Sequence, residues 1–283
     1  MVRDGESIAL VGAGRMGTGI AWNLLRAGHA VGYLDHPGNA DTAEIDGAGA
    51  ERFGDLASLM RDRTAVILVV TGAPQVEAVV DGFLPHLGGA AVIDCSTSLP
   101  ETSRRMAERV EAAGSTWLDA AMTRTPKEAR EGRLGLILGG SDEVVARWRP
   151  VLESFAESIQ HAGGPGDGHA MKLIHNFVSL GFSAVMAEAA AAADAQGIPR
   201  ERLVEVLGAG GGKSVVLDRF TPWLLEGDEA AFSFTLANAA KDTGYHSGAA
   251  GAGARLAALV AAIYREAAER APGAPVPVLT EML

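Results

Sequence analysis

The amino-acid sequence predicts an α/β protein with a doubly wound parallel sheet in its N-terminal part, a long interdomain helix and an all-α C-terminal domain. Two observations carry this prediction. Up to about residue 160, short and continuously apolar runs alternate with amphipathic stretches, a pattern typical of buried parallel strands covered by helices on both faces. After the cluster GGPGDG at 163–168 the strand pattern stops and helical periodicity takes over.

The N-terminal elements follow from the apolar runs and their boundaries. We expect strands at Ser7–Val11, Ala30–Leu34, Ala65–Thr71, Ala90–Cys95, Thr116–Leu118 and Leu134–Gly139. Amphipathic stretches predict helices at Thr18–Ala27, Gln75–Val80 and Glu101–Ala113. A further helix begins after Ser141, because the sequence Ser-Asp-Glu suits a helix N-terminus.

The C-terminal part is predicted to contain helices only. The expected helices are Met171–Gln196, Arg200–Leu207, Val215–Leu225, Thr235–Gly251 and Ala254–Ala271, with a tail from Pro272. The first is apolar on nearly every side, which indicates burial. We therefore expect a domain at 1–162 and a helical domain at 163–283, which includes a linking helix at about 168–196.

Composition and charge exclude several classes of protein. The chain has 283 residues, 48% of them hydrophobic, which is too apolar for a disordered protein. A net charge of −11 argues against a nucleic-acid partner. The single Cys95 and the spacing of the seven histidines predict no metal site. No apolar run reaches membrane-spanning length, and Asp4 and Glu6 oppose a secretion signal, so we expect a cytoplasmic protein without a membrane partner.

A glycine turn predicts the cofactor class. Gly12, Gly14 and Gly17 form G-x-G-x-x-G around Arg15 and Met16, directly after the first strand and at the start of a helix. In this context the pattern is the dinucleotide-binding fingerprint of a Rossmann domain, in which the helix N-terminus holds the pyrophosphate. The alternative is an ordinary glycine turn of an α/β protein.

Asp35 predicts which dinucleotide is preferred. It ends the second expected strand, where a carboxylate accepts hydrogen bonds from the ribose hydroxyls of NAD and repels the 2′-phosphate of NADP. His36, Pro37, Gly38 and Asn39 follow it, so no arginine stands beside it in sequence. We therefore expect NAD(H) as the cofactor.

Further separated motifs resemble one family. They are VGAGRMGTGIAWNL at 11–24, DCST at 94–97, DAAMTRT at 119–125, GHAMKLIHN at 168–176 and Lys241-Asp242 preceded by Phe234. Together they resemble the β-hydroxyacid dehydrogenases, the group of 3-hydroxyisobutyrate and tartronate-semialdehyde enzymes. The resemblance extends over nearly the whole chain and implies an NAD-dependent oxidoreductase acting on a CH–OH group, which forms homodimers or homotetramers.

The resemblance also implies roles for individual residues. Lys172 and Asn176 stand four residues apart on one helix face, where the family carries its catalytic lysine and a substrate-binding asparagine. Lys172 would be the general acid in reduction. The remaining implied contacts are Ser96 for the substrate, and Thr97, Phe234 and Lys241 for the cofactor. His169 and His175 are expected to pack, whereas packing and pocket roles stay equally open for Tyr245 and His246.

Departures from the family pattern indicate the substrate. Most members of the family carry D-A-P-V-S-G-G at this motif. In this chain Ala121 replaces the proline, Thr123 replaces the serine, and Arg124 and Thr125 replace the two glycines. An arginine between two threonines suits an oxyanion and resembles the sulfolactaldehyde reductase branch, which favours 3-sulfolactaldehyde and 2,3-dihydroxypropane-1-sulfonate as the substrate pair. Alternatively, Arg124 is an exposed residue or pairs with an acid such as Glu128. Other readings of the function are a succinic, methylmalonic or tartronic semialdehyde reductase, a 3-hydroxyisobutyrate-type dehydrogenase, an imine reductase or a non-catalytic NAD-binding protein.

Overall fold

The computed structural model describes residues 5–251 and 253–283. The chain divides into two compact units, Met1–Lys172 and Leu173–Leu283. The division lies inside the long helix α8 (Asp167–Ala195), later in the chain than the GGPGDG cluster that the sequence suggested. The first turn of α8 belongs to the first unit because it packs on that unit's strands, as described below.

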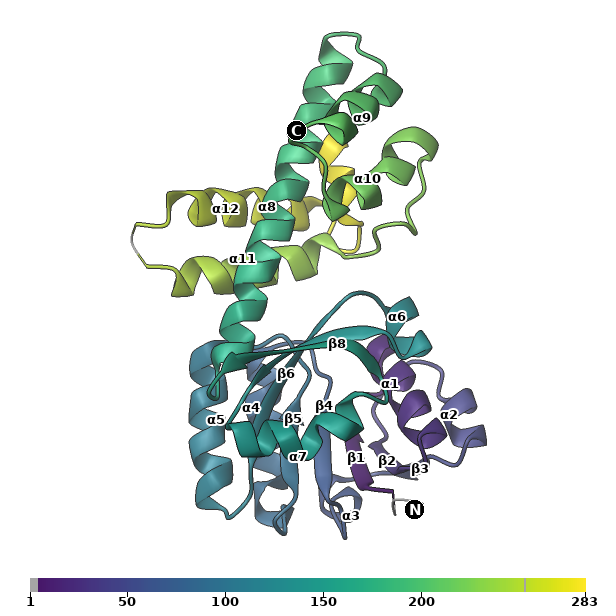
Figure 1. Ribbon diagram of the computed structural model, residues 1–283, viewed down its shortest axis with the longest axis vertical. Helices are drawn as coiled ribbons and strands as arrows, with labels where there is room; N and C mark the ends of the chain where they lie inside the picture. The colour runs from purple at the N-terminus through teal and green to yellow at the C-terminus, as the bar shows by residue number, and fades with distance from the viewer. Residues whose placement is uncertain (1–4, 252) are drawn as a thin grey trace. The chain divides into compact units, whose positions relative to one another are not determined.

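The first unit is built on an eight-stranded sheet, shown in Figure 1. Its order is β3-β2-β1-β4-β5-β6-β7-β8. The strands are β1 (Ser7–Val11), β2 (Ala30–Leu34), β3 (Glu51–Phe53), β4 (Ala65–Leu68), β5 (Ala91–Asp94), β6 (Trp117–Thr123), β7 (Leu134–Gly139) and β8 (Ala156–Gly163). All neighbours are parallel except β6 and β7, which pair antiparallel. The sheet is therefore mainly parallel, as the sequence predicts. The antiparallel pair follows from its connection, because only the short helix α6 (Pro126–Glu131) joins the two strands.

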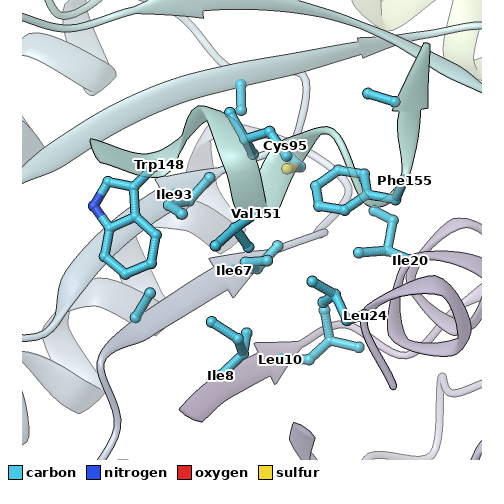
Figure 2. Close-up of a cluster of buried hydrophobic side chains, with 14 of the residues drawn as sticks. Ile8, Leu10, Ile20, Leu24, Ile67, Ile93, Cys95, Trp148, Val151 and Phe155 are labelled. Atoms are coloured by element: carbon cyan, nitrogen blue, oxygen red, sulfur yellow. The ribbon is translucent and has the colours of Figure 1, made fainter. Parts of the chain in front are cut away.

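Alternating residues of the central strands face two layers of helices. Ile8 and Leu10 lie in one core with residues of α1 (Arg15–Arg26) and α7 (Asp142–Leu152), as Figure 2 shows. Ala9 and Val11 lie in a second core, formed with residues of α3 (Leu56–Leu59), α4 (Ala73–Phe83) and α5 (Pro100–Ala112). Coverage of both faces explains why these strands are apolar throughout.

Several short or polar elements escaped the sequence analysis. They are the edge strands β3 and β8, the helices α2 (Ala43–Gly47), α3 and α6, and the 3-10 turn Leu84–His86. The edge strand β8 carries AESIQHAG, in which most residues are at least partly exposed, so that it has no apolar run to detect. Conversely, the predicted strand Ala65–Thr71 ends at Leu68, and the strand at Thr116–Leu118 extends to Thr123.

The second unit is helical, as predicted. It comprises most of α8 with α9 (Arg200–Ala209), α10 (Val215–Glu226), α11 (Leu236–Ala249) and α12 (Arg255–Arg270). One buried core unites them around Phe220, Leu236 and Tyr264. The expected tail from Pro272 was wrong: Val276–Glu281 forms a 3-10 helix whose Val276 and Leu279 are buried in that core. The three prolines from Pro272 onward favoured a tail, although apolar residues of the same stretch pack on the core.

Helix α8 is long and apolar enough to cross a membrane by length and composition, the one such helix in the described part of the chain. Its composition has another explanation, because Leu180, Ala187 and Ala190 are buried in the core of the second unit. The Tyr264 hydroxyl of α12 also donates a hydrogen bond to the Leu180 carbonyl oxygen at 2.8 Å. These contacts are those of a core helix.

Candidate active site and cofactor site

The glycine turn follows β1 at the point where the order of the sheet reverses. Strand β2 lies on one side of β1 and β4 on the other, and ligands of open α/β sheets bind at this switch point. Gly12 has φ +105°, and a Cβ there would lie 2.2 Å from the Val69 carbonyl oxygen. A Cβ on Gly17 would lie 2.0 Å from the Gly12 oxygen. Both glycines are therefore required by the backbone itself.

Gly14 differs from its neighbours in a way that fits a ligand. It is the N-cap of α1, where no side chain caps the helix, and a Cβ placed on it would meet no protein atom within 4 Å. Arg15 is exposed and Met16 is partly buried. An uncapped helix N-terminus beside open space suits a pyrophosphate, which would accept hydrogen bonds from the first N–H groups. The arrangement fits NAD.

Asp35 lies directly after β2 and is half-exposed, but an arginine lies beside it after all. In the parallel pairing of β2 with β3, Tyr33 stands opposite Arg52. Arg52 Nη1 lies 3.9 Å from Asp35 Oδ1. The four residues that follow Asp35 contain no arginine, and the short charged segment around Arg52 has no apolar run that would mark it as a strand beside this carboxylate.

A buried histidine joins α8 to the strands of the first unit. His169 Nδ1 lies 2.7 Å from Ser103 Oγ of α5 and 3.3 Å from Asp119 Oδ1 of β6. Its Nε2 lies 3.2 Å from the Ser96 carbonyl oxygen and 3.7 Å from Asp94 Oδ2. Acceptors thus face both ring nitrogens, which is the environment of a doubly protonated imidazolium. His169 packs inside the first unit, as expected. The two carboxylates beside its ring were not expected from the sequence.

The charges of this cluster depend on one another. Burial alone would lower the pKa of His169, but Asp119 and Asp94 outweigh it and raise the pKa to about 9. Burial raises the pKa of Asp94 above its ordinary value, although His169 opposes the shift. Asp119 is held further by Trp117 Nε1 at 2.8 Å and the Gly166 N–H at 2.7 Å. Paired and hydrogen-bonded in this way, the buried ions are tolerated.

The cluster fixes the first turn of α8, and with it Lys172. Lys172 is one turn after His169 and only 7% exposed. Gly168 packs against β6 and β7, since a Cβ there would lie 2.8 Å from Asp119 Cβ and from the Gly139 nitrogen. Gly168 thus lets the start of α8 approach the sheet closely.

The loops after β4 and β5 meet through Ser96, which is 2% exposed. Its Oγ accepts a hydrogen bond from the Val70 N–H at 3.0 Å, and its own N–H donates to Asp94 Oδ1 at 2.9 Å. The predicted substrate residue Ser96 therefore has a structural contact already, although its hydroxyl retains a proton to donate. Thr97 beside it is partly exposed.

The residues of the expected oxyanion clamp have partners within the protein. Arg124 Nη1 lies 2.5 Å from Glu157 Oε2 of β8 and also bonds the Arg133 carbonyl oxygen. Thr125 is the N-cap of α6 and its hydroxyl bonds Glu128, while Thr123 ends β6 and is partly exposed. Arg124 thus pairs with an acid, as the alternative held, but with Glu157 and not Glu128. Its φ of +80° is a left-handed conformation that is uncommon for arginine.

The predicted residues of the second unit form a network of their own. Asn176 Nδ2 donates to Asp242 Oδ2 at 2.6 Å, and Lys241 Nζ lies 2.9 Å from Asp242 Oδ1. Phe234 packs on the core of this unit. His246 stacks on Phe177 with ring centroids 4.4 Å apart. Asp242 was missed because the resemblance assigned a role only to its neighbour.

Comparisons with known proteins show the family to which the chain belongs. Residues 7–163 match a family model described as the NAD binding domain of 6-phosphogluconate dehydrogenase. Residues 166–275 match one described as NAD-binding of NADP-dependent 3-hydroxyisobutyrate dehydrogenase. The chain belongs to the β-hydroxyacid dehydrogenase family. As an enzyme of this family it is an oxidoreductase acting on CH–OH groups, with NAD as its cofactor.

Individual relatives narrow the class of reaction. A 3-hydroxyisobutyrate dehydrogenase of Pseudomonas aeruginosa is 36% identical, with 76% of this chain and 74% of that protein aligned. A 3-sulfolactaldehyde reductase of Escherichia coli is 33% identical over 84% and 81%. A Mycobacterium tuberculosis 3-hydroxyisobutyrate dehydrogenase solved with L-serine superposes with a TM-score of 0.87 at 25% identity, over 98% of this chain and 99% of that one. This β-hydroxyacid dehydrogenase therefore acts on small hydroxy acids.

We expect His169 to remain protonated through neutral pH. Because its pKa rises from 6.5 to about 9 in the folded state, its protonation contributes stability that is complete below pH 6.5 and is lost as the pH rises through about 9. NMR titration of the ring signals, assigned by their absence in His169→Gln, should show the imidazolium form until that upper range. The free energy of unfolding should contain a matching decline. Ring signals that titrate below pH 6.5 would contradict the buried ion cluster.

Proposed function

We propose that this dehydrogenase interconverts a small anionic aldehyde and its hydroxy compound, with Lys172 as the general acid and base. One observation carries the proposal: Lys172 is an almost fully buried lysine in the first turns of α8, within the family's G-x-x-x-K-x-x-x-N motif. It lies in the same unit as the glycine turn and Asp35. A buried amine at such a place is more typical of proton transfer than of a solvated surface charge.

The proposed chemistry assigns proton transfer to the protein. NAD(H) supplies or accepts the hydride. In reduction Lys172 Nζ gives its proton to the carbonyl oxygen of the substrate, and in oxidation the neutral amine takes the hydroxyl proton. Asn176, one helical turn further along α8, is proposed to bind the substrate oxygen. At the carboxyl end of β5, Ser96 is proposed to supply a hydroxyl donor to the substrate and Thr97 one to the cofactor. Phe234 and Lys241 keep their proposed role towards the cofactor.

The anionic group of the substrate is the finer part of the proposal. A sulfonate, as in 3-sulfolactaldehyde, is supported by the Thr123-Arg124-Thr125 segment and by the similarity to the Escherichia coli reductase. A carboxylate semialdehyde or 3-hydroxyisobutyrate is supported by the similarity to the Pseudomonas aeruginosa enzyme. In either case Arg124 is proposed to hold the anion, and it must exchange its contact with Glu157 for the substrate.

Self-association is also proposed, through one face of α8. Ile174, Val178, Phe182 and Val185 are between 46% and 60% exposed. Their spacing places them within one narrow arc of the helix, and from Ile174 to Val185 the helix carries no charged residue. A contiguous apolar stripe without charge is typical of the core of a protein interface. A homodimer or homotetramer would bury it.

A cytoplasmic location is also proposed. It is supported by the single Cys95, which is buried and leaves no intrachain disulfide.

Replacing Lys172 by alanine should lower the turnover number about 10²–10⁴-fold, because the proton donor is lost. The binding of NADH, measured by its fluorescence, should persist. Lys127→Ala is the matched control, since Lys127 is an exposed lysine of α6. Turnover of Lys172→Ala within a few-fold of the unmodified enzyme would remove Lys172 from the mechanism.

The pair Arg124 and Glu157 gives predictions of opposite sign. Arg124→Ala should raise KM for the anionic substrate at least about tenfold, because a charge-assisted contact is lost. Glu157→Gln should lower KM, because it releases the guanidinium from its ion pair. Both variants are measured with NADH on a panel of sulfonate and carboxylate semialdehydes, whose ranking identifies the anion. Unchanged KM values in both variants would show that Arg124 does not bind the substrate.

The α8 interface is tested by introducing charge. Phe182→Glu should shift the molar mass in light scattering towards the monomer, because a carboxylate opposes burial in an apolar contact. Val206→Glu serves as the control, since Val206 of α9 is an apolar residue that is even more exposed than Phe182, 63% against 51%. A monomeric unmodified protein, or equal effects of the two substitutions, would refute this interface.

A further inference from the structure

Arg52 is held unusually firmly for a half-exposed arginine. Its Nε donates to the Tyr33 hydroxyl at 2.8 Å. Its Nη2 donates to Thr42 Oγ1 and to Asp46 Oδ2, both at 3.0 Å. Tyr33 and Thr42 also bond Asp46, so that the guanidinium belongs to a closed network between β2, β3 and α2 with its N-cap Thr42. An arginine restrained in this way loses little side-chain entropy when it binds an anion.

The third guanidinium nitrogen, Nη1, lies near the carboxylate of Asp35. Arg52 Nη1 lies 3.9 Å from Asp35 Oδ1, which is beyond hydrogen-bond distance but close enough for ion pairing. Arg52 and Asp35 have side chains that are 51% and 52% exposed, so a ligand has access to both. Asp35 is the residue placed to accept hydrogen bonds from the ribose of NAD. A phosphate on the ribose 2′-oxygen would therefore meet Nη1 and the Asp35 carboxylate together.

The charges around the site decide whether the attraction of Arg52 or the repulsion of Asp35 dominates for a 2′-phosphate. Asp46 remains ionised, because the Tyr33 hydrogen bond and then those of Thr42 and Arg52 lower its pKa. One guanidinium therefore faces two carboxylates, Asp46 and Asp35. A 2′-phosphate would add about two further negative charges to a site that is already negative. Removing the Asp35 charge leaves the guanidinium paired with Asp46 alone and exposes Nη1 to the ligand.

We propose that Arg52 is a second determinant of cofactor specificity, a preformed site for a ribose 2′-phosphate that Asp35 masks. Asp35 accordingly has two actions: it accepts hydrogen bonds from the ribose of NAD, and it occupies the one side of Arg52 that a phosphate would use. This inference rests on the NAD site and is independent of the proposed role of Lys172. It also places the specificity of the site in the pairing of β2 with β3, and not in the turn after β2.

The test compares Asp35→Ser with two double variants. In Asp35→Ser the dissociation constant of NADPH should fall at least about tenfold, because one charge-assisted contact to the phosphate becomes available. In Asp35→Ser/Arg52→Met this gain should be lost. In Asp35→Ser/Arg26→Met it should persist, because Arg26 is an exposed arginine at the opposite end of α1 from the glycine turn. The two double variants have the same net charge, so a general electrostatic effect would change them equally.

Binding is measured by nucleotide fluorescence for NADPH and NADH, and by calorimetry with 2′,5′-ADP and 5′-AMP, which differ in the 2′-phosphate. These readouts need no turnover, so a failure of the catalytic proposal leaves them interpretable. Equal NADPH affinities of Asp35→Ser and Asp35→Ser/Arg52→Met would overturn the proposal, as would an equal loss in the Arg26 control. Asp35→Asn, which keeps the side-chain shape, is the second variant should Asp35→Ser not fold, and the same outcomes apply to it.

Discussion

The first unit depends on a buried imidazolium between two carboxylates. His169 joins the start of α8 to Asp119 of β6, Asp94 of β5 and Ser103 of α5. Because Asp94 and Asp119 stand opposite each other in the parallel pair β5–β6, their side chains point to the same face of the sheet. Two carboxylates on one buried face repel each other unless a cation lies between them. With its pKa raised to about 9, His169 supplies that cation in the first turn of α8.

This constraint determines where the proposed proton donor lies. Once His169 and the close packing of Gly168 fix the first turn of α8, the regular helix carries Lys172 to a buried position one turn further on. The same ring bonds the carbonyl oxygen of Ser96 and so also holds the loop after β5. The proposed general acid and the proposed hydroxyl donors are therefore positioned by one ion cluster.

At the cofactor end of the unit, strand pairing determines which side chains meet. Tyr33 and Arg52 meet because β2 and β3 are parallel neighbours in register. Their side chains and those of Thr42 and Asp46 form the network that brings a guanidinium to Asp35. The proposed preference between NAD and NADP then rests on the charges of three residues, Asp35, Asp46 and Arg52. Only Asp35 was visible as a sequence motif.

The sequence by itself determined the α/β class, the helical second unit, the glycine turn with Asp35 and the family motifs around Lys172. These features depend on local periodicity, on backbone conformations that only glycine adopts, and on spacing along one helix, all of which are properties of neighbouring residues. The tertiary structure alone decided the antiparallel β6–β7 pair, the ion pair of Arg124 with Glu157, the charge on His169 and the approach of Arg52 to Asp35. Each of these joins residues far apart in the chain, such as Asp94 with His169 or Arg124 with Glu157. Strand pairing and burial set such contacts, and no local pattern encodes them.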